Sequence, residues 1–236
     1  MCKWPTVEAM PRETLTRDRV VLAAVELLDA EGVDGLSMRR LGERLGSAAT
    51  AVYWHVGNKE NLVSLACDRV WDELPLPDPD TLGWRAAASA QMVEAHAMFR
   101  RHRWVVHAMT GQPVYGPGIA RYRDHAYAIY EAAGFADAEL DWALHTVFTF
   151  LLGQATADTA DLGARTDAVR EDERMSEIVS SAREIAERFP RLRARIAALE
   201  SEDQSGFAEQ GFAFGLDVIL DGLEARVAAR SAAQRG

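Results

Sequence analysis

Apolar residues recur along this chain at intervals of three and four, the period of a helix that packs one face on a core. The first such segment starts at Thr16, a candidate N-cap, and stops at Gly32, in the manner of a C-terminal glycine. Its core-facing positions are Val20, Val21, Ala24, Leu27 and Leu28. No stretch shows the alternation typical of a strand, so the sequence predicts an all-α fold.

Two short helices and a longer one are expected next. Ser37 would cap a helix over 38–45, Gly46 would break it, and a second short helix would follow over about 48–55. A longer helix would run from Lys59 to about Leu74, capped by Asn58. Two short helices joined by a glycine-containing turn are typical of a helix-turn-helix.

The second short helix has the composition of a DNA-reading element. Its start is a run of small or polar residues: Ser47, Ala48, Ala49, Thr50 and Ala51. Such a run is poor for a buried helix but suits close approach to base edges in a major groove about 12 Å wide. The residues that follow, where the phosphate backbone would pass, are Trp54, His55 and Lys59. Leu41, Leu45 and Val52 would lock the two short helices together.

Prolines mark the best candidate for a linker, since three of the eight fall within 74–80. We expect a head of residues 1–63, the helix-turn-helix domain, and a larger helical body of residues 64–236 for ligand binding and dimerisation. Further helices are expected over about 82–101, 103–110, 117–133, 137–160, 172–188, 191–200 and 205–230. The charged stretch 158–173 is expected to be a mobile loop.

Charge is unevenly divided over the 236 residues, whose net charge is -10. The head carries 8 Lys or Arg and 9 Asp or Glu, whereas the body carries 18 and 27. Because an acidic body repels nucleic acid, only the head could meet DNA. No apolar run reaches the ~20 residues of a membrane helix, and the N-terminus lacks a signal-peptide core. Cys2 and Cys67 form no zinc spacing, and a cytoplasmic protein is expected.

The segment "TRDRVVLAAVELLDAEGVDGLSMRRLGERLGSAATAVYWHVGNKENLV" (16–63) resembles the DNA-binding head of the TetR family of transcriptional regulators, with "YWHV" and "NK" as its most specific parts. The resemblance implies an all-helical homodimer that binds a palindromic operator in double-stranded DNA and releases it when a small molecule enters the body. It gives Arg39 a base-contacting role. It makes Ala49, Thr50, Ala51 and Tyr53 base-facing, and Trp54, His55 and Lys59 phosphate-contacting.

The recognition positions also depart from the tetracycline-repressor branch of that family. Ala49 and Ala51 stand where that repressor has larger or hydrogen-bonding side chains, and alanine can touch only thymine methyl groups. Direct readout would therefore fall mainly on Arg39 and Thr50, and the operator sequence cannot be transferred. An alternative role for Tyr53 and Trp54 is packing in the core of the head.

Three body segments resemble the tetracycline-repressor type of C-terminal domain: "RRHRWVVHAM" (100–109), "YGPGIARYRDHAYAIYEAAGF" (115–135) and "ALHTVFTFLLGQA" (143–155). The resemblance implies that helices 137–160 and 205–230 form a four-helix dimer interface with their mates. Their apolar stripes are Leu144, Phe148, Leu151, Leu152 and Gly153 on one, and Phe212, Phe214, Leu216, Ile219, Leu220 and Leu223 on the other. A charged residue at Ile219 is expected to separate the dimer.

The helices over about 82–133 would line the effector pocket. Gln91, Ala95 and Phe99 share one helical face, and Tyr122 and Ala126 share another, a mixture that suits a planar and largely hydrophobic ligand. His145 and Phe148 match pocket-facing positions of the family. For Phe99, and for His145 and Phe148, the alternative is plain packing in the core or the dimer interface.

A metal–tetracycline complex is not expected in that pocket. His107 falls near a family position that helps to bind the metal–drug complex, but no partner histidine stands in the neighbourhood of Trp71. His96, His102 and His107 are five or six residues apart, which does not align them on one helical face, so each should be hydrogen-bonded individually. We expect no metal and no cofactor.

Two classes of function remain. The first is a ligand-responsive DNA-binding regulator, expected to be a repressor. The "YWHV" block together with Arg39 favours this class. The second is an all-helical enzyme or small-molecule-binding protein whose helix-turn-helix serves protein contacts. The chain carries no nucleophile elbow, no phosphate-binding loop and no metal signature, so the expectation is a regulator and not an enzyme.

Overall fold

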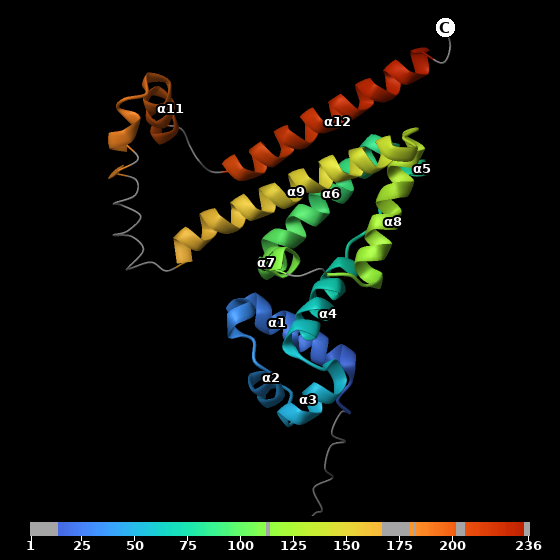
Figure 1. Cartoon of the computed structure of the whole chain (residues 1–236), viewed down its shortest axis with the longest axis vertical. Helices are drawn as coiled ribbons and strands as arrows, with labels where there is room; N and C mark the ends of the chain where they lie inside the picture. The colour runs from blue at the N-terminus through green and yellow to red at the C-terminus, as the bar shows by residue number, and fades with distance from the viewer. Residues whose placement is uncertain (1–13, 112–113, 167–179, 182, 202–205, 234–236) are drawn as a thin grey trace, which may run out of the picture.

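The computed structural model describes residues 14–111, 114–166, 180–181, 183–201 and 206–233. Within these ranges the chain is all-α, as predicted, and contains no strand. The head lies at one end of the molecule, and a single helix, α4, rises from it into the larger helical body (Figure 1). In the part of the chain that is described, no helix is both long enough and apolar enough to cross a membrane.

The head consists of three helices that start where the sequence predicts. α1 (Arg17–Gly35) is capped by Thr16, whose hydroxyl accepts a hydrogen bond from the Arg19 amide, and its helical geometry is interrupted at Gly32, where φ is 69°. α2 (Met38–Arg44) is capped by Ser37. α3 (Ala49–Val56) follows after a turn. The predicted core residues Leu41 and Val52 are fully buried, whereas Leu45 is half-buried.

The turn between α2 and α3 depends on a close approach at Gly42. The Ser47 amide donates to the Gly42 carbonyl at 2.8 Å. A Cβ placed at Gly42 would lie 2.9 Å from the Ser47 carbonyl oxygen and 3.1 Å from the Ala49 amide nitrogen. Both neighbours are backbone atoms, which cannot rotate away, so only glycine lets α3 pack this closely on α2.

α4 (Lys59–Asp72) belongs to both parts of the molecule. Asn58 caps it by accepting from the Asn61 amide at 2.7 Å. It packs on α1 and α3 in the head and on α7 and α8 in the body, and it buries Leu62, Ala66 and Trp71. The proposed domain boundary after residue 63 therefore falls inside a continuous helix. Burial raises the pKa of the Cys67 thiol on α4 to about 12.

α8 (Pro117–Ala132) is fastened to α4 at its first turn. Asp68 accepts a hydrogen bond from the Ile119 amide at 2.9 Å and so satisfies one of the unpaired N–H groups of the helix start. Two glycines make room for this contact, because a Cβ at Gly116 would meet the Asp68 carboxylate and one at Gly118 would meet the Asp68 carbonyl. One turn later, Arg121 pairs with Asp72 at 3.0 Å.

The linker region differs from the prediction. A helix was expected to begin at about residue 82, but a short α5 (Pro79–Leu82) ends at Gly83 and α6 (Trp84–Arg101) starts afresh. Gly83 has φ of 79°, a left-handed conformation that breaks the helix. The stretch 74–80 is held against the body, because Leu74 is buried and the Pro77 carbonyl lies 2.9 Å from Nε2 of His125.

Five further segments complete the described fold: α7 (Trp104–Gly111), α9 (Asp137–Thr166), residues 180–186 with a gap at 182, α11 (Pro190–Ser201) and α12 (Phe207–Ala233). The long helices α9 and α12 pack side by side along the body, and α11 lies apart from them (Figure 1). Of the helix predicted over 172–188, the first part lies outside the described residues.

The loop expected over 158–173 is wrong for its first nine residues, because α9 continues to Thr166. Asp158 does not face solvent as a loop residue would. Its carboxylate lies 2.7 Å from Nε2 of His96 and accepts from the Gln154 amide at 3.0 Å. These contacts satisfy a charge that the sequence pattern assigned to solvent, so the helix can continue past it. Residues 167–173 lie outside the described part of the chain.

We expect Gly42→Ala to destabilise the head, although alanine normally favours a helix over glycine. The added methyl must displace backbone atoms of the turn, and overpacking of this kind costs about 1–3 kcal/mol. Urea denaturation followed by circular dichroism measures the change. Gly111→Ala is the matched control, because a Cβ there has open space within 4 Å. Equal stability of the two variants would contradict the close-approach argument.

Candidate DNA-binding surface and effector cavity

α3 presents its predicted contact residues to solvent. Val52 and Val56 are buried against the head, which turns Thr50, Tyr53 and Trp54 outward. The Tyr53 side chain is 49% exposed and that of Trp54 82% exposed, so the alternative that they form the head's core is wrong. Large aromatic side chains rarely stand this far out of a folded surface without a partner.

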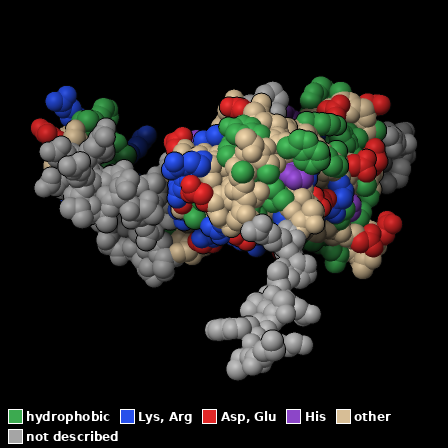
Figure 2. All heavy atoms as spheres, turned by 90° about the horizontal axis from the view of Figure 1, so that it is seen from below, with side chains coloured by type: hydrophobic (Ala, Val, Ile, Leu, Met, Phe, Trp, Pro, Cys, Tyr) green, Lys and Arg blue, Asp and Glu red, His purple; other side chains and the backbone are tan. Residues whose placement is uncertain are grey.

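The other residues predicted on this surface lie around those aromatics. Ser47, Ala49, Ala51 and His55 are half-buried, and the His55 ring meets Trp54 edge-on with 4.8 Å between centroids. Seen from below, with the end that carries α2 and α3 toward the viewer, hydrophobic side chains gather on the surface with charged side chains of both signs around them (Figure 2). Lys59, the first residue of α4, is half-buried beside this end of the molecule.

The three arginines of α2 have different surroundings. Arg40 binds Glu31 and the Gly35 carbonyl of α1, and Arg44 pairs with Glu26 of α1 at 2.6 Å. These two arginines fasten α2 to α1. Among the described residues, Arg39 has an ion pair only within its own helix, with Glu43 at 3.5 Å, and its side chain is 83% exposed. An exposed pair of this spacing contributes about 0.3–0.5 kcal/mol, so it does not prevent Arg39 from reaching a base.

A cavity of about 730 Å³ lies inside the body, between α4, α6, α7, α8 and α9. Its size is in the range of drug-sized ligand sites. Its lining residues are Trp71, Gln91, Met92, Met109, Val114, Ile119, Tyr122, Arg123, Ala126, Tyr127, Tyr130, Asp141, Trp142, Leu144, His145, Val147, Phe148, Thr149 and Leu152.

Aromatic rings dominate the inner wall of this effector cavity. Trp71 meets Tyr122 at 4.7 Å between ring centroids and Phe148 at 6.4 Å. Burial raises the pKa of both Tyr122 and Tyr130 above the usual value of a phenol. The Tyr130 hydroxyl is buried and has no hydrogen-bond partner among the described residues.

Polar groups in the effector cavity are few. Gln91 is buried on α6 and donates to the Tyr122 carbonyl at 3.3 Å. Asp141 accepts from the Tyr127 hydroxyl at 3.1 Å, and His145 lies 3.5 Å from the Thr149 hydroxyl. A few polar groups, of which Arg123 and Asp141 are ionisable, therefore stand among apolar surfaces, which favours a ligand that is mostly apolar with a few polar atoms.

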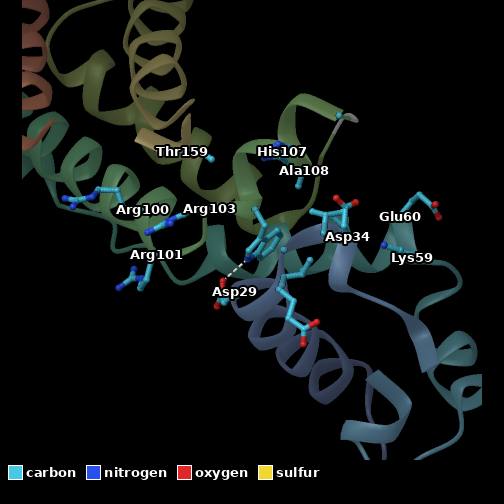
Figure 3. A pocket seen from close by; sticks show the side chains of 17 residues that line it. Asp29, Asp34, Lys59, Glu60, Arg100, Arg101, Arg103, His107, Ala108 and Thr159 are labelled. Atoms are coloured by element: carbon cyan, nitrogen blue, oxygen red, sulfur yellow. Dashed lines mark hydrogen bonds between the residues drawn. The ribbon is translucent and has the colours of Figure 1, made fainter. Parts of the chain in front are cut away.

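The structure brings five of the seven predicted pocket residues to this cavity: Gln91, Tyr122, Ala126, His145 and Phe148. Phe99 does not line it and packs behind Trp71, with 5.6 Å between their rings, which fits the packing alternative. His107 faces a different hollow of about 880 Å³, between head and body, which Lys59 also lines (Figure 3). Trp71 and Tyr130 line the cavity although sequence reasoning missed them. The sequence could have predicted Tyr130, because this residue lies on the same helical face as Tyr122 and Ala126.

Two of the three spaced histidines are hydrogen-bonded individually, as predicted. His96 contacts Asp158 and stacks on Phe212 with 4.0 Å between centroids. His102 contacts Asp29 of α1 at 2.7 Å between Nδ1 and Oδ1. In the described ranges, no group of three or more His, Cys, Asp or Glu side chains is placed to hold a metal ion.

The apolar stripes predicted as a dimer interface mostly serve the chain's own core. Leu151, Phe212, Leu216, Leu220 and Leu223 are buried within the single chain, because α9 and α12 pack on each other. Gly153 and Phe214, which also belong to the predicted stripes, lie instead on a face of each helix that remains exposed. On α9 it carries Trp142, Thr146, Thr149, Gly153 and Thr156, and on α12 it carries Phe207, Gly211, Phe214, Val218, Gly222 and Ala225.

That outer face has the pattern of a helix-packing surface. Its members repeat at intervals of three and four, and they are small or apolar. Phe214 is 73% exposed and Trp142 67% exposed. Gly153, Gly211 and Gly222 would meet nothing within 4 Å if they carried a Cβ. Glycine inside a helix costs about 0.5–1 kcal/mol relative to alanine, and nothing within the single chain offsets this cost.

Comparison with known protein families gives one match for the head and one for the body. Residues 20–66 match the family described as bacterial regulatory proteins, tetR family. Residues 76–227 match the tetracyclin repressor-like C-terminal domain. The second match alone spans more than half of the chain, and the residues between the two matches form the end of α4 and the start of the linker.

Individual relatives have the same architecture. The transcriptional repressor DrrR1 of Streptomyces coeruleorubidus is 35% identical over 226 residues, which cover 93% of this chain and 81% of the relative. The class A tetracycline repressor of Escherichia coli is 31% identical over 90% of this chain and 92% of its own. The Streptomyces coelicolor protein ActR, solved in complex with actinorhodin, superimposes with a TM-score of 0.73 at 26% identity, over 91% of this chain and 99% of ActR. The chain therefore belongs to the TetR family and is a ligand-responsive, DNA-binding transcriptional regulator.

Proposed function

We propose that this TetR-family regulator binds a palindromic operator as a homodimer and releases it when a planar aromatic effector enters the body cavity. The observation that carries the DNA-binding part is the outward orientation of Tyr53 and Trp54 on α3, beside an accessible Arg39. In this proposal Arg39 and Thr50 read base edges, together with Ala49, Ala51 and Tyr53. Ser47, Trp54, His55 and Lys59 hold the phosphate backbone.

A second copy of the chain would cover the outer face of α9 and α12. Apolar surface with helical periodicity and no partner among the described residues indicates a partner of matching shape, and a two-fold axis lets one face meet itself. Trp142 and Thr149 line both this face and the effector cavity, so the partner would also close the mouth of the cavity. Two heads would then present two recognition helices, one for each half of a palindrome.

The effector class follows from the walls of the cavity. Six aromatic side chains line it, and neutral donors such as the Tyr130 hydroxyl lie among them. Stacking surfaces with few polar groups suit a fused-ring ligand with carbonyl or hydroxyl substituents. That ActR, with the same fold, was solved in complex with actinorhodin supports a small-molecule effector for this chain.

The alternative, an enzyme or binding protein that uses its head for protein contacts, has less support. The matched families and the named relatives are regulators and repressors. The ionisable groups of the effector cavity are Arg123, Asp141, His145 and the phenols of Tyr122, Tyr127 and Tyr130, a set that suits binding without requiring a reaction. The proposal places the protein in the cytoplasm, where operator DNA lies.

We expect Arg39→Ala to weaken operator binding by about 1–3 kcal/mol, because it removes a base contact while leaving the head folded. Lys59→Ala should instead weaken binding to all sequences alike and reduce the salt slope by about one unit. Fluorescence anisotropy with operator and random duplexes at several salt concentrations separates the two effects. Glu43→Ala is the control, since it removes the partner of Arg39 and leaves the arginine in place. If Arg39→Ala distinguishes operator from random DNA as well as the wild type does, Arg39 is not a reading residue.

Val218→Asp should convert the dimer into monomers and abolish tight operator binding. The side chain is 54% exposed on the outer face of α12, so the substitution spares the chain's own core. Ile219, chosen from sequence alone, is half-buried against that core and is a poorer test because its replacement would also disturb folding. Sedimentation velocity measures the oligomeric state. Ala229→Asp changes an exposed residue farther along the same helix and is expected to weaken the dimer less than Val218→Asp does. A wild-type chain that sediments as a monomer would contradict the dimer.

An aromatic ligand should lower operator affinity without competing at the DNA surface. A thermal-shift screen of fused-ring aromatic compounds, together with actinorhodin, would find such ligands, because one at 100 times its Kd stabilises the protein by about 2.7 kcal/mol. Phe148→Trp should fill part of the cavity, leave DNA binding intact and abolish the response to that ligand. Operator affinity that stays constant at saturating ligand would contradict induction, and affinity that rises would make the ligand a corepressor.

A further inference from the structure

In the part of the chain that is described, the head is connected to the body at two main places. The first is the continuous helix α4. The second is a contact between the end of α1 and the start of α7, on the wall of the hollow between head and body (Figure 3). Here the Asp29 carboxylate of α1 accepts a hydrogen bond from the Trp104 indole N–H at 2.7 Å. The same oxygen, Oδ1, lies 2.7 Å from Nδ1 of His102. We call this contact the Asp29 clasp.

The clasp is well fixed on its body side. Trp104 is buried, and only 12% of the His102 side chain is exposed. Hydrogen bonds to a carboxylate are shorter and stronger than neutral ones, and these reach from the head to residues 73 and 75 positions later in the chain. His102 and Trp104 belong to the segment "RRHRW", which the DNA-binding surface and the effector cavity leave without a role.

The neighbouring charges in the hollow do not compete for the clasp. Glu31 is bound to Arg40 within the head, and Arg100 pairs with Glu209 of α12. Asp34 also lines the hollow, is exposed, and makes no ion pair with any residue described in the structure. Asp29 is therefore an acidic side chain of this hollow that ties the head to the body, and Asp34, on the same helix, provides a matched comparison.

The clasp is also connected to the effector cavity. α7 has only eight residues, with Trp104 at its start and Met109 five positions later. Met109 lines the effector cavity, whereas Trp104 lines the hollow at the clasp. A short helix whose buried side chains pack on α1, α4, α6 and α9 moves as one piece, so a shift at Met109 is transmitted to Trp104.

We propose that Asp29 is a positioning residue, which sets the angle of the head on the body through His102 and Trp104. In a dimer this angle determines the distance between the two recognition helices, and thus which separation of operator half-sites is accepted. The inference rests on the proposed operator binding. It adds that the spacing selectivity is controlled by a side chain that touches neither DNA nor effector.

The test measures spacing selectivity without an effector. A palindrome is first selected from random DNA by the full-length wild type. Duplexes are then made in which the half-sites are moved closer or farther by one and two base pairs, about 3.4 Å per step along the axis with a rotation of roughly 35°. Wild type should prefer the selected spacing over a two-base-pair change by about tenfold or more, whereas Asp29→Ala should reduce this preference to about threefold or less.

Three variants separate positioning from general loss of structure. Asp29→Asn keeps an oxygen acceptor for the indole N–H and should retain the wild-type spacing preference. Asp34→Ala removes the same charge from the same helix and should behave as wild type. Trp104→Phe keeps a buried ring but removes the donor, so it should relax the preference even if Asp29→Ala does not fold. Binding of each variant to random duplex DNA, which needs no fixed head spacing, should stay within about twofold of wild type.

The outcomes are distinct. If Asp29→Ala and Trp104→Phe both keep the wild-type spacing preference, the clasp does not position the head and the inference is overturned. If Asp34→Ala relaxes the preference as much as Asp29→Ala, the effect belongs to charge and the inference also fails. If the wild type selects no sequence at all, the proposed operator binding is wrong, and the inference falls with it.

Discussion

The packing of α4 on both halves of the molecule is the interaction on which the rest of the structure depends. Its first turns close the core of the head against α1 and α3, and its last turns carry Trp71 to the wall of the effector cavity. α8 is fastened to the same helix through Asp68 and Arg121, at a turn where Gly116 and Gly118 let the two backbones approach. Because close-packed interiors do not deform continuously, a ligand that displaces Trp71 or α8 must move α4 as a unit. In the proposed switch, α4 would therefore link DNA recognition to effector binding without direct contact between the two sites, and the contact of α1 with α7 at the Asp29 clasp would be a second link.

Charge and shape divide the work between the two parts of the chain. The body carries most of the negative charge, which keeps DNA away from it, while the head is close to neutral and projects an aromatic recognition helix. Two of the three arginines on α2 are used to hold the head together, which leaves Arg39 for an outside partner. In the body, buried phenols line a cavity. The mouth of that cavity borders the exposed face of α9. Dimerisation and effector binding would then share residues, so the two properties should depend on each other.

The sequence predicted the head well because its signals are local. A capping side chain, a helical period and a glycine that ends a helix all act within a few residues, and the caps at Thr16, Ser37 and Asn58 lie where they were expected. Predictions for the body were weaker where a partner distant in the chain decides the outcome. Asp158 looks like a loop residue until His96, 62 positions earlier, satisfies its carboxylate. The stripes on α9 and α12 look like an interface until each helix is seen to bury the other's apolar side chains.

The sequence by itself determined the all-helical fold, the order of helices in the helix-turn-helix, and five of the residues that line the effector cavity. It did so because helical periodicity places residues on a common face, and because the order of short helices in the head restricts how they can pack. Only the tertiary structure decided that Phe99 packs behind Trp71, that His107 faces the hollow between head and body, and that His102 and Trp104 converge on Asp29. Periodicity defines a helical face but not which neighbour that face meets. That choice depends on how helices far apart in the chain are oriented when the whole core is assembled.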